Sequence, residues 1–230
     1  MNSGRKSSLA AIETIARAVE HGPDKLVFVG GTVTALYPLE GNIRPTLDVD
    51  CVVDVTTTSA YYDVVKRLHN LGFKACTDEG APLCRLVYRG ILVDLVATPA
   101  LPVGPTNRWY RDAVKEAGLY EVASDLTVLA IIPMYFVATK LEAFRSRGGG
   151  DFAASHDLED VLTVLGGLPD LRNAIDIETS EVALALRSEL AALAVRGAFI
   201  DAVPGHCDGE ATGQGCADVV LDWLESVVAR

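Results

Sequence analysis

The chain has 230 residues and a formal net charge of −11, and half of its residues are hydrophobic. A chain of this length can bury the core of one large domain or two small ones. Its apolar runs stop well short of the roughly 20 residues that a membrane-spanning helix needs, and residues 1–8 form a short polar segment that lacks the features of a leader peptide. The composition therefore predicts a compact globular protein with no membrane partner.

The five cysteines are odd in number and lack the paired spacing of a metal finger. We therefore expect free thiols and a location in a reducing cytoplasm. The alternative is a zinc site built from His206, Cys207 and Cys216, but one short His/Cys cluster in a glycine-rich segment is more often incidental.

Taken in chain order, the hydrophobic patterns predict these elements: a helix over residues 7–21, a strand over 25–29, a helix over 32–38, a strand over 48–54, a helix over 58–71, and strands near 73–76, 83–89 and 91–97. Beyond residue 125 the pattern becomes mainly helical, and residues 204–215 resemble a long polar loop. This order predicts an α+β fold, with a mixed sheet in a domain over 1–125 and a helical C-terminal region over 126–230. From residue 170 onward the sequence supports no functional prediction.

A glycine turn lies between the predicted strand over residues 25–29 and the predicted helix over 32–38. The strand-like residues 25–29 run into Gly30, Gly31 and Thr32, and helical spacing follows over residues 33–37. Such a turn presents backbone N–H groups to an anion, and glycine lets a ligand approach the backbone closely. A single Gly-Gly pair is a weak signal, but this one lies just upstream of two carboxylates, so these three residues are candidate phosphate-binding residues.

Those two carboxylates, Asp48 and Asp50, begin the strand over 48–54. Successive side chains of a strand point to opposite faces, so both aspartates must share one face. Two carboxylates in an apolar neighbourhood raise each other's pKa unless a cation neutralises them. Oxygen ligands on a rigid strand suit Mg²⁺, which takes one or two carboxylates and shares its other positions with water and substrate phosphates.

Asp94 is the polar exception in the apolar run over residues 91–96, which is typical of a buried strand. If that strand lies beside the strand of Asp48 and Asp50, Asp94 completes a site of three carboxylates. The structural alternative is that the first two aspartates flank a solvated strand end and that Asp94 marks an edge strand. Asp54 shares the parity of Asp48 and Asp50 but precedes a turn-like segment, so we assign it to the surface.

Two helices are expected between residues 133 and 165. The first begins at Pro133, where the missing N–H costs nothing, and Lys140 is its only cation before Arg145. A lysine in such a place usually buries its aliphatic stem against the core while its ammonium group reaches water. Glycines 148–150 separate this helix from the next.

The second of these helices begins after Ser155, a good N-cap residue. Its apolar residues follow helical spacing, namely Leu158, Val161, Leu162 and Leu165. Asp157 lies on the border of this stripe and Asp160 lies further toward solvent. The structural alternative for both is a charged first turn that suits the helix dipole.

The order Val-Gly-Gly-Thr, then Arg-Pro-Thr-x-Asp-x-Asp, then a lone aspartate in a later apolar strand resembles the nucleotidyltransferase superfamily with the polymerase-beta-like core. Within it the sequence is most similar to the AbiEii-type nucleotidyltransferases, many of which are toxins of bacterial toxin–antitoxin pairs. Arg44 and Thr46 match the Arg-x-Thr-x-Asp-x-Asp string of that family. The long segment between Gly31 and Asp48 fits this branch better than an aminoglycoside-modifying enzyme. The resemblance covers residues 25–165.

This resemblance implies a Mg²⁺-dependent enzyme that transfers an NMP from an NTP to an acceptor hydroxyl and releases pyrophosphate. It implies that Asp48, Asp50 and Asp94 hold metal, with Asp94 either binding a second ion or accepting the hydroxyl proton. The implied nucleotide-binding residues are Gly30, Gly31, Thr32, Arg44, Thr46 and Lys140. In similar proteins the pattern Ala-Thr-Lys-Leu-x-Ala carries a lysine into the nucleotide pocket, and the first acid of an Asp-x-x-Asp pair, here Asp157, lies near the active site.

The resemblance also implies an RNA acceptor such as tRNA, or a protein acceptor, and an antitoxin protein as partner. The net charge of −11 opposes RNA, because proteins that bind many phosphates normally have a basic surface. A local track could still serve; its residues are Arg85, Arg89, Arg108, Trp109, Tyr110, Arg111 and Lys115. The alternative for this track is a solvated loop and helix face. Rival functions are an antibiotic nucleotidyltransferase, a phosphotransferase and a non-catalytic nucleotide-binding module.

Overall fold

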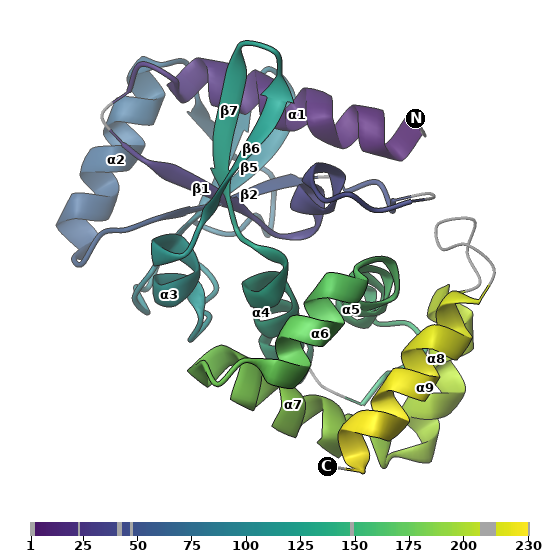
Figure 1. Ribbon diagram of the computed structural model, residues 1–230. Helices are drawn as coiled ribbons and strands as arrows, with labels where there is room; N and C mark the ends of the chain where they lie inside the picture. Colours follow the sequence, from purple (N-terminus) through teal and green to yellow (C-terminus); the bar gives the residue numbers. More distant parts are fainter. Residues whose placement is uncertain are drawn as a thin grey trace. The chain divides into compact units, whose positions relative to one another are not determined.

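A computed structural model describes residues 3–22, 24–40, 43–46, 48–147, 150–207 and 215–229 (Figure 1). The chain divides into two compact units. The first comprises Ser3–Leu36 and Arg44–Ile132, and the second comprises Tyr37–Ile43 and Pro133–Arg230. Among the described residues, no helix is both long enough and apolar enough to cross a bilayer.

The first unit contains a seven-stranded mixed sheet with the order β3-β4-β5-β2-β1-β7-β6. Its strands are β1 (Leu26–Val29), β2 (Asp48–Val53), β3 (Lys74–Ala75), β4 (Arg85–Tyr88), β5 (Ile91–Ala97), β6 (Gly118–Ala123) and β7 (Leu126–Ala130). Strand β2 runs parallel to β5 and antiparallel to β1, and β1 runs parallel to β7. The predicted α+β class with a mixed sheet is confirmed.

The helices of this unit are α1 (Ser3–Val19), the 3-10 helix η1 (Gly31–Leu36), α2 (Thr58–Asn70) and α3 (Tyr110–Lys115). Thr57 caps α2 by accepting a hydrogen bond from the Ala60 backbone N–H. The buried Tyr61 of α2 donates its hydroxyl proton to the Leu95 carbonyl of β5 at 2.8 Å. This bond fixes the helix against one of the strands that carry the candidate carboxylates.

Strands β6 and β7 were not anticipated from the sequence. They form an antiparallel pair, and β7 joins the sheet beside β1. A short apolar run such as Leu126–Ala130 has no periodicity that separates a strand from a buried helix segment, which explains the omission. The helical part of the chain therefore begins at Pro133, after this hairpin.

The secondary structure described for the second unit is helical, and its helices are α4 (Pro133–Ser146), α5 (His156–Gly167), α6 (Pro169–Ile177), α7 (Glu181–Ala194), α8 (Gly197–Cys207) and α9 (Cys216–Val228). Pro133 begins α4 and the Ser155 hydroxyl caps α5, as predicted. The apolar stripe of α5 is buried at all four predicted positions.

Two connecting segments were predicted from the sequence, a polar loop over 204–215 and a triglycine link over 148–150. The predicted polar loop over 204–215 was wrong at its start, because residues 204–207 are the last turn of α8. Pro204 therefore lies inside α8 and not in a loop. Residues 208–214, and Gly148 and Gly149 of the predicted triglycine link, lie outside the described residues.

Candidate active site

The candidate carboxylates lie on neighbouring strands of the sheet. Strand β5 is the direct parallel neighbour of β2, as the site required, and the register pairs Asp50 with Asp94 and Asp48 with Leu92. Paired residues of adjacent strands point to the same face. Asp48, Asp50 and Asp94 therefore share one face of the sheet. Asp94 is buried with 8% of its surface exposed, whereas the other two are partly exposed.

A cation from β4 already engages two of these carboxylates. Arg85 lies opposite Asp94 in the antiparallel register of β4 and β5. Its Nε donates to Asp94 Oδ1 at 2.7 Å and its Nη2 donates to Asp94 Oδ2 at 2.7 Å. The same Nη2 reaches Asp48 Oδ2 at 3.0 Å. Hydrogen bonding to Asp94 raises the pKa of Arg85 above its already high value, so this side chain is a permanent positive charge among the carboxylates.

Arg85 was assigned from the sequence to a track for RNA, and the structure corrects this assignment. Its guanidinium faces the carboxylates of the sheet rather than a basic surface. The hairpin turn explains the contact, because Arg89 and Gly90 both have positive φ angles, as a two-residue type I′ turn requires. Such a turn after Tyr88 fixes the register and places Arg85 opposite Asp94.

Gly30 determines where the side chain of Asp50 lies. Its φ is +70°, and a Cβ added at this position would lie 1.9 Å from Asp50 Oδ2. The Asp50 carboxylate therefore occupies the space that any other residue at position 30 would fill. The predicted closeness of the glycine turn and the Asp-x-Asp strand is thus present in the structure.

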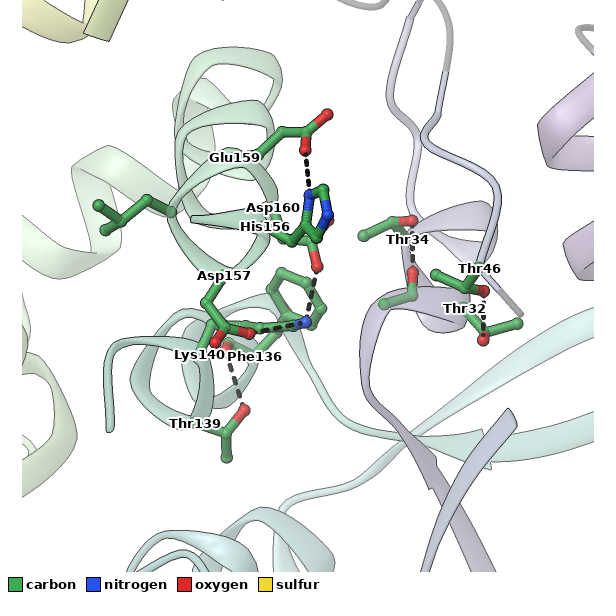
Figure 2. A network of polar contacts seen from close by, with 12 residues as sticks. Thr32, Thr34, Thr46, Phe136, Thr139, Lys140, His156, Asp157, Glu159 and Asp160 are labelled. Atoms are coloured by element: carbon green, nitrogen blue, oxygen red, sulfur yellow. Dashed lines mark hydrogen bonds and ion pairs between the residues drawn. The ribbon is translucent and has the colours of Figure 1, made fainter. Parts of the chain in front are cut away.

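The segment after Gly30 is tied to the start of β2 through two threonine hydroxyls. Thr32 Oγ1 donates to the Asp48 carbonyl at 2.6 Å, so Thr46 Oγ1, 2.8 Å away, donates to Thr32 (Figure 2). Gly31 begins η1, and its carbonyl accepts a bond from the Thr34 hydroxyl at 2.7 Å. Four of the predicted nucleotide-binding residues, Gly30, Gly31, Thr32 and Thr46, are therefore assembled beside the aspartates, and the fifth of this unit, Arg44, lies partly buried two residues before Thr46.

The glycine turn offers an anion fewer binding groups than the sequence predicted. The predicted α-helix over 32–38 is a 3-10 helix of six residues, which gives a much smaller dipole than a long α-helix. The Thr32 hydroxyl is also committed to the Asp48 carbonyl. What remains for a ligand at this turn is the close approach that Gly30 and Gly31 permit.

The donor chemistry of the face fits a hard divalent cation. Asp48 and Asp50 supply carboxylate oxygens from one strand, and Mg²⁺ is often held by only one or two carboxylates. Among the described residues, no group of three or more His, Cys, Asp or Glu side chains is placed to hold a metal ion. With Arg85 bound to Asp94, the fit therefore rests on Asp48 and Asp50.

In the second unit, Lys140 of α4 lies between two aspartates of α5 (Figure 2). Its Nζ is 2.6 Å from Asp160 Oδ2 and 3.3 Å from Asp157 Oδ1. Asp157 also accepts three hydrogen bonds from Arg147, whose Nη2 lies 2.7 Å from Asp157 Oδ2. The side chains of Lys140, Asp157 and Asp160 are nearly buried, so these charges form a compensated network within the helical unit.

The predicted exposure of Asp160 was wrong, because only 5% of its surface is exposed. The residue is tolerated inside because the Lys140 ammonium compensates its charge. Helical periodicity alone assigns a charged residue to the solvent side, because it contains no information about the neighbouring helix that carries the compensating lysine. Arg147 was also missed as a partner of Asp157.

The remaining members of the predicted basic track are only partly available. Trp109 was expected to offer a stacking surface, but it is buried, with 5% of its surface exposed. The Arg108 guanidinium lies 4.6 Å from the Trp109 ring centre, and Lys115 pairs with Asp112 at 3.0 Å. Arg89, Arg108 and Arg111 are exposed or partly exposed.

All five cysteines are free thiols. Burial raises the pKa of the Cys84 thiol to about 11, and the charge of Asp94 adds to this shift. Cys84 is therefore protonated near neutral pH and is a poor nucleophile. In the alternative zinc cluster of His206, Cys207 and Cys216, His206 Nε2 lies 2.6 Å from the Phe152 carbonyl oxygen, so this ring nitrogen already has a hydrogen-bond partner.

Comparison with known proteins adds one finding. No protein-family profile and no curated protein matches the sequence. Among solved structures, the chain is similar to ANT(2")-Ia, crystallised in complex with adenylyl-2"-tobramycin, with a TM-score of 0.49 and 14% sequence identity over 79% of this chain and 98% of that chain. So distant a likeness has no bearing on substrate or reaction, and the likeness to AbiEii-type proteins stays a prediction from the residues.

Proposed function

We propose that this protein is a nucleotidyltransferase that moves an NMP from an NTP to an acceptor hydroxyl and releases pyrophosphate. One observation carries the proposal: Asp48, Asp50 and Asp94 share a face of two parallel strands, and Gly30 gives the Asp50 carboxylate its place. Three like charges on one face repel one another, and in this structure Arg85 is paired with two of them, Asp48 and Asp94.

Asp48 and Asp50 would hold Mg²⁺, which when bound supplies positive charge to the phosphate oxygens of the nucleotide. The hydrogen bond from the Thr32 hydroxyl to the Asp48 carbonyl holds the first residue of β2 against the glycine turn. In the transfer, a bond forms between the acceptor oxygen and the α-phosphorus while the bond from that phosphorus to the pyrophosphate oxygen breaks. The resemblance assigns Asp94 a second cation or the hydroxyl proton, and either role would require an Asp94 oxygen to leave Arg85.

Lys140 and Asp157 keep their proposed roles, in which Lys140 neutralises the triphosphate and Asp157 lies beside it. In the structure the Lys140 ammonium is paired with Asp157 at 3.3 Å and Asp160 at 2.6 Å, so a triphosphate would compete with these two carboxylates for it. Arg44, which precedes Thr46, is proposed as a second cation for the phosphates.

The family resemblance favours RNA or another protein as the acceptor. It also favours a role for this chain as the toxin of a toxin–antitoxin pair, with an antitoxin protein as its partner. A small-molecule hydroxyl is the second candidate. Two observations favour it over RNA: Trp109 is buried, and Arg85 is bound to Asp94 and Asp48. Both residues are thereby removed from the predicted RNA track.

The test is incubation of the protein with each α-³²P-labelled NTP and Mg²⁺, in the presence of total RNA, cellular protein or a small-molecule extract. We expect label in one acceptor fraction, whereas label from γ-³²P-NTP in the acceptor would identify a phosphotransferase instead. Binding of nucleotide without transfer of either label would identify a non-catalytic module.

Matched variants test the carboxylates. Asp48→Asn and Asp50→Asn should each lower the transfer rate at least about 100-fold, because loss of a metal ligand removes several kcal/mol of transition-state stabilisation. Asp54→Asn is the control, since Asp54 directly follows β2, has the same parity and is exposed, with a hydrogen bond from Thr98. A wild-type rate in Asp50→Asn would remove the proposal.

A further inference from the structure

Arg85 is the residue of the carboxylate face that the proposed chemistry does not use. It belongs to β4, a different strand from those that carry the aspartates, yet its fork takes both oxygens of Asp94. Its Nη2 is shared between Asp94 Oδ2 at 2.7 Å and Asp48 Oδ2 at 3.0 Å, so one nitrogen bridges the two carboxylates. Only 23% of the side chain is exposed, which limits screening of these contacts by water.

The two sets of bonds are unequal. Asp94 is held by two short bonds in the planar geometry that a guanidinium matches best. Asp48 is held by one longer bond and has the more exposed side chain, at 33% against 12% for Asp94. The contact to Asp48 is therefore the one that an incoming cation can replace.

We propose that Arg85 is a built-in counter-cation of this site, which holds Asp48 and Asp94 in place in the metal-free protein and competes with a divalent cation for Asp48. This inference rests on the proposed function, because it concerns the same carboxylates. Arg85 acts as a positioning residue: it keeps the carboxylates in their bound arrangement before the cation arrives, and it weakens cation affinity in exchange.

The test measures cation binding and stability rather than turnover. Mg²⁺ affinity is measured by titration calorimetry on the full-length protein without nucleotide, and thermal unfolding is followed in EDTA and in Mg²⁺. Arg85→Gln should lower Tm in EDTA and tighten Mg²⁺ binding by about tenfold, because a competing positive charge has left two carboxylates. Mg²⁺ should restore more of the lost Tm in this variant than it adds to the wild type.

Arg89→Gln is the matched control. It removes the same charge from the adjacent hairpin turn, where the Arg89 guanidinium lies over the Tyr88 ring at 5.4 Å. Equal tightening in both variants would reduce the effect to net charge and overturn the proposal. If Arg85→Gln does not fold, Arg85→Lys decides, since a single ammonium cannot hold both Asp94 oxygens and also reach Asp48, so Asp48 is released and Mg²⁺ should bind more tightly than in the wild type. Mg²⁺ binding no tighter than in the wild type overturns the proposal in either variant.

The proposed function and this inference can fail separately. Tighter Mg²⁺ binding in Arg85→Gln together with no NMP transfer by the wild type would leave the inference standing and remove the proposed function. Transfer by the wild type together with unchanged Mg²⁺ affinity in Arg85→Gln would do the reverse. Absence of Mg²⁺ binding in the wild type and in both Arg85 variants would overturn the inference itself.

Discussion

At the scale of single residues, Gly30 has a role that no other amino acid can take. Its φ of +70° lies in the left-handed region, and the space of its missing Cβ is filled by the Asp50 carboxylate. A side chain at position 30 therefore meets two separate penalties, one in the backbone and one from the displaced carboxylate. Asp50 can remain in its place only while position 30 is glycine.

Replacement of Gly30 by alanine separates these penalties when it is compared with Gly90→Ala. Gly90 also has a positive φ, +83°, but an added Cβ there meets nothing within 4 Å. Gly90→Ala should lower the free energy of unfolding by about 1–2 kcal/mol through the backbone alone. Gly30→Ala should lose more in urea unfolding and should also lose transfer activity. Equal losses in the two variants would show that Asp50 does not need this space.

Lys140 offers a second prediction for a single residue. Lys140→Met removes one partner of a buried ion network, so the free energy of unfolding should fall by about 3–5 kcal/mol. Adding Asp160→Asn should restore part of the loss, because it removes the carboxylate left uncompensated at 2.6 Å. Lys115→Met is the control, since its pair with Asp112 is exposed and such pairs contribute about 0–1 kcal/mol.

The kinetics of Lys140 variants test whether this lysine also binds the nucleotide. If Lys140 also contacts the triphosphate, Lys140→Ala should raise KM for NTP and lower kcat, and Lys140→Arg should restore only part of the loss. Unchanged kinetics, measured at a temperature where Lys140→Ala stays folded, would confine this lysine to its structural role. The comparison of stability with kinetics thus separates the two functions of one side chain.

At the scale of elements, the tie between η1 and β2 depends on one hydroxyl. Thr32 is almost fully buried, with 2% of its surface exposed, and it bonds both the Asp48 carbonyl and Thr46. The 3-10 helix η1 and the strand β2 that carries the aspartates are therefore joined by hydrogen bonds of the Thr32 side chain. Movement of one element should be transmitted to the other.

Thr32→Val keeps the shape of the side chain and removes both bonds. We expect the free energy of unfolding to fall by about 1–3 kcal/mol, because the Asp48 carbonyl and the Thr46 hydroxyl lose the partner that Thr32 provides. Thr14→Val should be nearly neutral in the same denaturation experiment, since the Thr14 hydroxyl bonds the Ala10 carbonyl on an exposed helix face. A similar small effect in both variants would contradict the tie.

At the scale of the whole molecule, the charge of −11 limits which acceptor can be attracted from a distance. Phosphate contacts release counterions, so for an RNA acceptor Arg108→Glu with Arg111→Glu should lower the slope of log affinity against log salt by about one to two units. For a small-molecule acceptor, no such change should appear. The burial of Trp109 and the contacts of Arg85 lead us to expect the second result.

The control for this experiment is Lys6→Glu with Lys66→Glu, which changes the net charge equally at two exposed positions outside the predicted track. The measurements are RNA labelling from low to high salt and NTP binding without RNA, which should stay unchanged. Loss of RNA labelling in the Arg108 and Arg111 variant alone would contradict our expectation and establish the RNA track.

Most elements of the fold could be predicted, because they depend on local patterns. The strands β2 and β5 and the helices α4 and α5 lie close to their predicted bounds, and Ser155 caps α5 as expected. Strands β6 and β7 escaped because their short apolar runs carry no distinguishing period. The parity of Asp48 and Asp50 required only the alternation of a strand, so their common face was determined by the sequence itself.

The tertiary structure alone decided which charges meet. Arg85 faces Asp94 because of the register between β4 and β5, and Lys140 faces Asp160 because α4 packs beside α5. Burial of Trp109 is likewise a property of its surroundings and not of its local pattern. Local periodicity follows from backbone geometry, which the sequence determines residue by residue, whereas the partner of a buried charge depends on which distant segment folds against it.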